Sequence, residues 1–155
     1  MNNTILNCYV VDDSSIQRLA IVKMIENHPN LKLIGEFSNA IETKAAIKDQ
    51  KVDLIFLDVE MPILTGFDLL DDITEKPGVI FVTGQTKYAF KAFDYAAIDY
   101  LQKPIKKDRF SLCCRKSITC AQVTYRKEMI EDRGEFIFVK SNLKKRKVYL
   151  KELKY

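Results

Sequence analysis

The sequence predicts a doubly wound α/β fold, in which helices cover both faces of a five-stranded parallel sheet. Short apolar runs alternate with longer amphipathic segments along the first 130 residues, which is the pattern of repeated strand–helix units. The runs are apolar at consecutive positions, as expected for strands that are buried on both faces. Turn signals separate the units, so the alternation indicates separate elements joined by short connections.

Local signals support each unit in order. Ser14 or Ser15 can cap the first helix, and Ser38 with Asn39 can cap the second. The first helix carries an apolar face made by Ile16, Leu19, Ala20, Met24 and Ile25. Turn pairs precede the second and fourth strands, at Pro29-Asn30 and Pro77-Gly78. The expected strands are residues 5–11, 31–37, 53–57, 79–83 and 98–101, and the expected helices are residues 14–27, 39–49, 65–75, 87–95 and 107–129.

Size and composition indicate one globular domain with a short appendage. The chain has 155 residues, of which 47% are hydrophobic and 30% charged, a balance that supports a core and argues against disorder. No apolar run approaches the roughly 18 to 20 residues that cross a bilayer, and the first residues do not resemble a signal peptide. We therefore expect a cytoplasmic protein without membrane contact, whose four cysteines are reduced thiols rather than a zinc site.

Polar side chains follow four of the five apolar runs. Asp12 and Asp13 end the first run, Asp58 ends the third, Thr83 ends the fourth, and Lys103 follows the fifth. Because the carboxyl ends of parallel strands share one edge of the sheet, we expect these five side chains to meet in one crevice. Each residue alone has a structural alternative as a helix cap or a loop residue, but their joint placement favours a functional site.

This set of groups suits phosphoryl transfer. Two carboxylates about 4 Å apart repel each other by on the order of 4 kcal/mol at an effective dielectric constant near 20, and Mg²⁺, which prefers oxygen ligands, removes that conflict. Asp58 is the best candidate nucleophile, because its strand is the most apolar and should be central. Thr83 can donate a hydrogen bond to a phosphoryl oxygen, and Lys103 can neutralise another. A cis bond before Pro104 would aim the lysine.

Residues 4–125 resemble the receiver domains of two-component response regulators. In this resemblance Asp12 and Asp13 match the acidic pair that helps to hold Mg²⁺, and Asp58 matches the phosphoacceptor. Glu60 matches the position whose backbone carbonyl is a further metal ligand. Further matches are the loop residues Pro62 and Gly66, the switch hydroxyl of Thr83, the lysine Lys103 with Pro104, and the aromatic Tyr100, which changes rotamer with Thr83.

The resemblance implies a flavodoxin-like sheet order of 2-1-3-4-5 and a phosphoryl donor that is a sensor histidine kinase or a phosphotransfer protein. It implies no enzyme activity beyond Mg²⁺-dependent self-phosphorylation and autodephosphorylation, tuned by Glu60 and Gln85. Phosphorylation of Asp58 would draw Thr83 inward and let Tyr100 turn in behind it.

The surface built by the fourth helix, fifth strand and fifth helix would then change and form a homodimer. Phe90 and Phe93 belong to this surface. They either serve a partner or pack on the sheet.

The C-terminal part has a different character. Residues 1–102 carry 9 Lys and Arg against 15 Asp and Glu, a net charge of −6, whereas residues 103–155 carry 16 against 6, a net charge of +10. Apolar runs at residues 135–139 and 147–150 predict a β-hairpin that resembles the start of a LytTR-type DNA-binding domain. We therefore expect a receiver domain over residues 1–130 and, over residues 131–155, a linker and the beginning of an incomplete output domain. Control of transcription and contact with DNA would need the complete parent protein.

Two other classes of protein share part of this pattern. Haloacid-dehalogenase-like phosphohydrolases use a strand-end Asp nucleophile, a Ser or Thr, a Lys and Mg²⁺, but their acidic pair follows the lysine, whereas Asp12 and Asp13 precede it here. A flavodoxin-like nucleotide or flavin binder needs a phosphate loop after the first strand. The acidic pair would repel that phosphate, and the sequence has no glycine-rich phosphate-binding motif.

Overall fold

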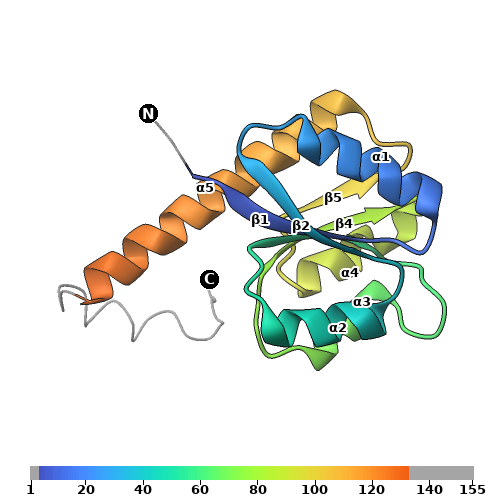
Figure 1. The fold of residues 1–155 in the computed structure, drawn as a ribbon, viewed down its shortest axis with the longest axis horizontal. Coiled ribbons are helices and arrows are strands. Elements are labelled where there is room, and N and C mark those ends of the chain that lie inside the picture. The colour runs from blue at the N-terminus through green and yellow to red at the C-terminus, as the bar shows by residue number, and fades with distance from the viewer. Residues whose placement is uncertain (1–3, 133–155) are drawn as a thin grey trace. The chain divides into compact units, whose positions relative to one another are not determined.

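The computed structural model of the chain describes the backbone of residues 4–132 and the side chains of residues 4–124. Five strands and their connecting helices alternate along the chain (Figure 1). The strands are β1 (Leu6–Val11), β2 (Leu31–Phe37), β3 (Leu54–Asp58), β4 (Gly78–Thr83) and β5 (Asp99–Gln102). The helices are α1 (Ser15–Glu26), α2 (Ala40–Asp49), α3 (Gly66–Asp72), the 3₁₀ helix η1 (Thr86–Tyr88), α4 (Ala89–Asp94) and α5 (Lys107–Asp132).

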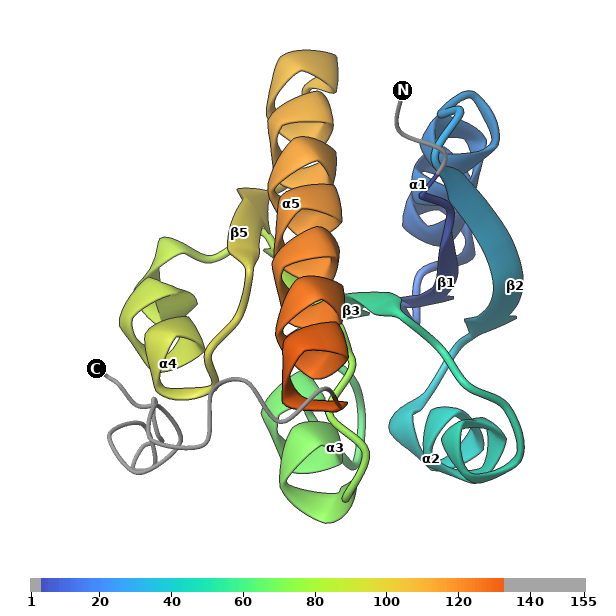
Figure 2. The same cartoon turned by 90° about the vertical axis from the view of Figure 1, so that its left-hand side faces the viewer.

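The strands form one parallel sheet in the order β2-β1-β3-β4-β5, which confirms the predicted order. Helices α2, α3 and α4 lie on one face of this sheet, and α1 and the part of α5 before residue 120 lie on the other (Figure 2). The chain divides into two compact units, residues 1–119 and residues 120–155, and the sheet lies in the first. The predicted hairpin at residues 135–139 and 147–150 lies outside the described residues, and the predicted boundary near residue 130 stays a prediction.

Side-chain caps begin the first three α-helices. The Ser14 hydroxyl accepts a hydrogen bond from the Gln17 N–H at 3.4 Å, and the Asn39 side chain accepts one from the Glu42 N–H at 2.8 Å. Such caps satisfy backbone donors that have no partner within the helix. In α3 a reciprocal pair of bonds joins Thr65 at the cap to Asp68, three residues on.

The core is centred on β3, all five residues of which are buried. Aromatic rings fill both sides of the sheet: Phe56 stacks on Phe110 of α5 with ring centroids 5.4 Å apart, and Phe81 packs against Phe67 of α3 at 4.8 Å. Burial of one such ring contributes about 1.5–3 kcal/mol to the hydrophobic driving force. This packing keeps β3, and the carboxylate that ends it, in the centre of the sheet.

Helix α1 differs from the predicted apolar face. Its buried side chains are Ile21, Val22 and Ile25, whereas Ile16 and Leu19 are 80% and 53% exposed. The buried positions all lie in the second half of the helix, so its first half, residues 15–20, leaves its apolar side chains on the surface. The apolar face predicted for this helix therefore contributes only part of its side chains to the core.

Three of the four cysteines are core residues. Cys8 of β1 and Cys113 and Cys114 of α5 are buried, whereas Cys120 is exposed. Burial raises the pKa of the Cys8 and Cys114 thiols to about 12, so at neutral pH both are protonated. Among the helices within residues 4–132, none combines the length and the apolar character that a membrane crossing requires.

Candidate functional site

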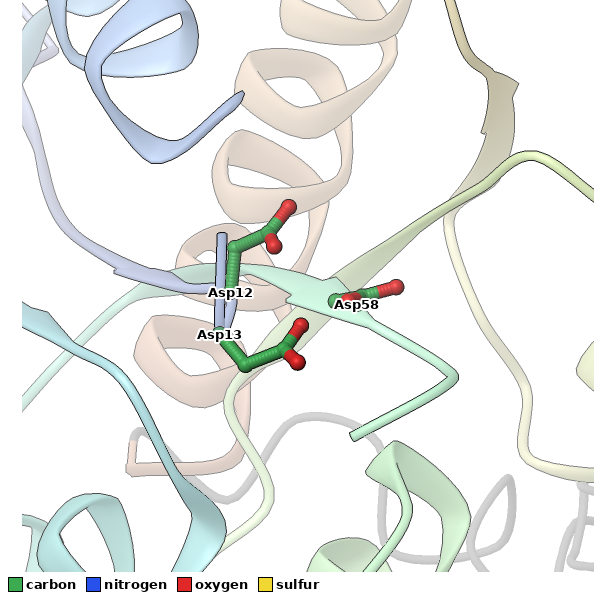
Figure 3. Close-up of side chains that lie close together, drawn as sticks. All are labelled: Asp12, Asp13 and Asp58. Atoms are coloured by element: carbon green, nitrogen blue, oxygen red, sulfur yellow. The ribbon is translucent and has the colours of Figure 1, made fainter. Parts of the chain in front are cut away.

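Three carboxylates meet at the carboxyl edge of the sheet. Val11 of β1 pairs with Leu57 of β3, so the next residues, Asp12 and Asp58, emerge side by side. One oxygen from each of Asp12, Asp13 and Asp58 lies within 4.8 Å of the others, and Figure 3 shows the three side chains gathered at the ends of β1 and β3. The strand register therefore produces the convergence that the sequence predicted for these three residues.

Lys103 joins this cluster from the connection after β5. Its ammonium nitrogen lies 3.0 Å from Oδ2 of Asp12 and 3.6 Å from Oδ1 of Asp58. Burial, and then the Asp12 carboxylate, raise the pKa of Asp58 to about 7, although Lys103 and the Glu60 N–H oppose the shift. One ammonium therefore does not compensate the negative charge that the carboxylates bring together.

The acidic cluster fits a hard divalent cation. Oδ2 of Asp12 is buried and accepts no hydrogen bond, although the Lys103 ammonium is close enough for an ion pair. Buried carboxylate oxygens are costly without a full set of partners, and the oxygens of Asp12, Asp13 and Asp58 are of the type that Mg²⁺ and Ca²⁺ prefer. Glu60 lies next to the cluster, since its N–H donates to Oδ1 of Asp58 at 3.3 Å. A role for its backbone carbonyl as a ligand stays a prediction.

Thr83 ends β4 beside the same edge, because Asp58 pairs with Val82. Its side chain is fully buried, and its hydroxyl accepts a hydrogen bond from the Gln85 N–H at 3.2 Å. Its carbonyl accepts a bond from the Lys103 N–H at 2.9 Å, so the ends of β4 and β5 are joined. The peptide bond between Lys103 and Pro104 is cis, the isomer predicted from the sequence.

Tyr100 of β5 contacts the connection that follows Thr83. It is half-buried, and its hydroxyl donates a hydrogen bond to the backbone carbonyl of Gln85. The hydroxyl of Thr83 and that of Tyr100 thus both bond to the backbone of Gln85, one to its N–H and the other to its carbonyl. A movement of the β4–α4 connection would disturb both bonds together.

The loop after β3 folds back onto the phosphoacceptor candidate. The Gly66 N–H donates to the Val59 carbonyl at 2.9 Å, and a Cβ at residue 66 would lie 2.5 Å from the Asp58 carbonyl oxygen. Only glycine allows this approach. Within the loop the Leu64 N–H bonds to the Pro62 carbonyl at 2.8 Å around Ile63, whose φ is 72°. This is the rarer, strained form of γ-turn, and no sequence signal marked it.

A second feature missed from the sequence is a bond between the two loops that flank the site. The Tyr88 hydroxyl donates to Oε2 of Glu60 at 3.0 Å. The two residues are 28 positions apart and on different connections, so neither periodicity nor a short motif could reveal the pair.

Helix α4 presents two aromatic side chains to solvent. Phe90 and Phe93 are 87% and 80% exposed, so the alternative in which they pack on the sheet is wrong. Ala92 is the buried residue of this helix. Both aromatic side chains of this helix are therefore surface residues rather than core residues.

A family model and the sequences of known relatives both match this chain to response regulators. The sequence model described as the response regulator receiver domain matches residues 8–113. A response regulatory protein of Shewanella oneidensis, itself uncharacterized, is 39% identical over 108 residues, which cover 68% of this chain and 46% of that protein. The transcriptional regulatory protein BtsR of Escherichia coli K12 is 34% identical over 102 residues, 64% of this chain and 43% of BtsR. The chain spans about half the length of the curated relatives it matches.

Solved structures share the fold. The response regulatory domain of protein mrkE from Klebsiella pneumoniae superposes with a TM-score of 0.69 at 27% identity, over 74% of this chain and 97% of that domain. The REC domain of AraT, a response regulator from Geobacillus stearothermophilus, gives a TM-score of 0.69 at 26% identity, over 78% of this chain and 99% of that domain. The five-stranded parallel architecture predicted from the sequence is therefore confirmed.

Proposed function

Because the chain belongs to the response regulator receiver family, we propose that it accepts a phosphoryl group on Asp58 in a Mg²⁺-dependent reaction and thereby switches a protein surface. The observation that carries this proposal is the environment of Asp58. Asp58 is 4% exposed, an ammonium lies 3.6 Å from its carboxylate, and oxygens of two further carboxylates lie within 4.8 Å. A nucleophile in this position has charge compensation for an incoming phosphoryl group on one side and oxygen ligands for a cation on the other.

The proposed step forms a bond between an Asp58 carboxylate oxygen and phosphorus. The bond between phosphorus and the donor breaks, and its electron pair leaves with the donor group, the imidazole of a phosphohistidine or the acetate of acetyl phosphate. Lys103 neutralises one phosphoryl oxygen, and the Thr83 hydroxyl turns to donate to another. Bound Mg²⁺ would offset the negative charge of the phosphoryl oxygens. Asp12 and Asp13, with Asp58 and the Glu60 carbonyl, are the proposed ligands.

Return to the resting state needs only water. A water oxygen attacks phosphorus, the bond from phosphorus to Asp58 breaks, and inorganic phosphate leaves as the carboxylate is restored. We propose no enzymatic turnover of other substrates, since the chain itself is the substrate. Glu60 and Gln85 are the residues proposed to set the rate of this hydrolysis.

The surface beside Lys103 suits the protein that donates the phosphoryl group. A groove of about 430 Å³ lies between α1 and the connection after β5, and it is lined by Ile16, Gln17, Ala20, Ile21, Met24, Lys103, Pro104 and Ile105. Lys103 belongs both to this groove and to the acidic site. A partner that fills the groove with an apolar helix therefore brings its phosphorylated side chain towards Asp58. We propose a sensor histidine kinase or a phosphotransfer protein as this occupant, within the cytoplasm.

The proposed output surface comprises α4, β5 and the first part of α5. Tyr100 and Thr83 both bond to Gln85, so inward movement of Thr83 frees Tyr100 and displaces the connection that leads to α4. Phe90 and Phe93 would then pack against a second copy of the chain. Control of transcription through a complete DNA-binding domain is the proposed role of a longer parent protein; the relative BtsR is a transcriptional regulatory protein.

Intact-mass analysis tests the proposal directly. Wild type incubated with acetyl phosphate and Mg²⁺ should gain the mass of one phosphoryl group, and Asp58→Asn should gain none. Asp49→Asn, which removes an exposed carboxylate at the end of α2, should behave as wild type. Labelling of Asp58→Asn at the wild-type level would overturn the assignment, and repeated turnover of p-nitrophenyl phosphate would favour a phosphohydrolase instead.

A further inference from the structure

Tyr88 and Glu60 connect the two loops that border the proposed phosphorylation site. The Tyr88 hydroxyl donates a 3.0 Å hydrogen bond to Oε2 of Glu60. Glu60 is the second residue after Asp58, and Tyr88 ends η1, which begins three residues after Thr83. The bond therefore joins the loop that follows the phosphoacceptor to the loop that follows the switch hydroxyl.

Packing fixes the ring of Tyr88 independently of this bond. Its centroid lies 5.9 Å from that of Phe67, a buried residue of α3, and the Lys87 ammonium lies 5.2 Å from the Tyr88 centroid. A cation at this distance from an aromatic face is attracted to it. The hydroxyl is thus presented by a ring that has contacts of its own, so loss of the oxygen alone removes the bond to Glu60 and leaves the ring contacts.

The backbone and the side chain of Glu60 have separate anchors. The Glu60 N–H donates to Oδ1 of Asp58 at 3.3 Å, which holds its backbone beside the accepting carboxylate. Its side chain is directed by Tyr88. Without the Tyr88 hydroxyl, a carboxylate on a flexible side chain would be free to move over a site that already contains three carboxylates and must receive a dianionic group. Glu60 is exposed, but like charges that come within a few ångströms of one another still repel.

We propose that Tyr88 is a positioning residue for phosphoryl acceptance: by holding the Glu60 carboxylate, it keeps an additional negative charge away from the incoming phosphoryl group. This inference rests on the proposed acceptance of a phosphoryl group by Asp58. According to this inference, the Tyr88 hydroxyl affects the rate of phosphoryl acceptance only through the position of the Glu60 charge. Replacing Glu60 by an uncharged residue should therefore make the reaction indifferent to the Tyr88 hydroxyl.

The test is a double-mutant cycle with acetyl phosphate as the phosphoryl donor. Tyr88→Phe should lower the rate constant for Asp58 labelling, followed by intact mass at fixed Mg²⁺, about fivefold, the equivalent of one ordinary net hydrogen bond. In the Glu60→Gln background, addition of Tyr88→Phe should leave the rate constant unchanged. A small-molecule donor excludes any effect on the docking of a partner protein.

Tyr95→Phe is the matched control. Tyr95 also donates to a carboxylate, Oδ1 of Asp71 at 2.9 Å, and its ring also packs on Phe67, with centroids 5.0 Å apart. Tyr95→Phe removes an equivalent hydroxyl from the same aromatic cluster. That hydroxyl does not bond to the loop after Asp58, so labelling should proceed at the wild-type rate. Thermal unfolding of each variant checks that it is folded.

The outcomes separate the inference from the function on which it rests. If wild type gains no phosphoryl group on Asp58, the proposed function and this inference both fall. If wild type is labelled and Tyr88→Phe is labelled equally fast, only the role of Tyr88 is overturned. The role of Tyr88 is also overturned if Tyr88→Phe slows labelling by the same factor in the Glu60→Gln background as in wild type. The effect would then be structural and would not act through the Glu60 charge.

Discussion

The ammonium nitrogen of Lys103 lies 3.6 Å from Oδ1 of Asp58, and the two side chains are only 17% and 5% exposed. Shielded from water, this pair interacts more strongly than a surface ion pair. Even so, burial and the Asp12 carboxylate hold the pKa of Asp58 near 7. The ammonium of Lys103 therefore lies where the proposed contact with a phosphoryl oxygen requires it.

Replacement of this lysine should affect chemistry more than folding. Lys103→Ala should lower the rate of Asp58 labelling by acetyl phosphate at least about tenfold. Its free energy of unfolding should fall by less than the roughly 3–5 kcal/mol that is typical when a buried ion pair loses one partner, since a buried carboxyl group that loses its cation can take up a proton. Urea unfolding and intact mass measure the two effects. Lys106→Ala, an exposed lysine three residues on, should change neither, and equal losses in Lys106→Ala would contradict a specific role for Lys103.

Mg²⁺ should raise the thermal midpoint of the protein. A cation that binds the folded chain alone stabilises it by about 1.4 kcal/mol at ten times its dissociation constant, and it would do so here by relieving the repulsion among Asp12, Asp13 and Asp58. Differential scanning fluorimetry with MgCl₂, matched in ionic strength with NaCl, measures the shift. The shift should be absent in the double variant Asp12→Asn, Asp13→Asn. An unchanged wild-type midpoint across a millimolar titration would argue against a cation site.

Asp99 should contribute to the acid sensitivity of the fold. Burial works against its ionised form, but hydrogen bonds lower the pKa of its carboxyl group to about 2. The donors are the Cys113 thiol, the Lys116 ammonium, the Tyr100 N–H and the Arg109 guanidinium. The unfolded chain, with a carboxyl pKa near 3.8, therefore binds the proton more readily than the folded chain. The stabilisation is complete above that value and disappears as the pH falls towards 2.

Urea unfolding at a series of pH values between about 5 and 2 measures this dependence. Asp99→Asn should flatten the decrease in the free energy of unfolding over that range. Asp94→Asn, which removes an exposed carboxylate of α4, should leave the decrease unchanged. A wild-type slope in Asp99→Asn would show that other carboxylates account for the acid response.

Ile63→Gly should stabilise the protein. A β-branched residue at a φ of 72° is strained, and the side chain is 89% exposed, so no packing offsets the strain. Glycine removes about 1–2 kcal/mol of strain but adds about 0.5–1 kcal/mol of unfolded-state entropy. We expect a net gain of about 0.5–1 kcal/mol in urea unfolding. Ile63→Ala keeps the backbone penalty and should give a smaller gain, and an equal gain in both variants would place the cost in the side chain instead.

The sequence predicted the sheet and the convergence of the acidic residues because both follow from local rules. Apolar runs identify buried strands, and residues that end parallel strands must lie at one edge. Asp12 and Asp58 meet because they end adjacent strands that are in register. Lys103 reaches the same edge because it follows β5. These inferences depend on strand order and not on side-chain packing.

The features that the sequence did not reveal depend on tertiary packing. The bond between Tyr88 and Glu60 joins the connections after β3 and β4, and its geometry depends on how the Tyr88 ring packs against Phe67. Ile63 has no local signal for its turn, since β-branched residues are rare at positive φ. Exposure of Phe90 and Phe93 depends on which face α4 turns towards the sheet, and a helix of six residues is too short for periodicity to decide this.

The burial of the thiols makes the order in which they react a measure of which part of the domain unfolds first. Cys8 is buried in β1, beside the central strand, Cys113 and Cys114 are in the helix that covers this face, and Cys120 is exposed in the native state. A thiol reagent should modify Cys120 at once and the other three only when their surroundings part from them. If Cys113 and Cys114 are modified before Cys8, α5 loosens around its own thiols while Cys8 stays covered. If all three are modified together, the domain melts as a single cooperative unit.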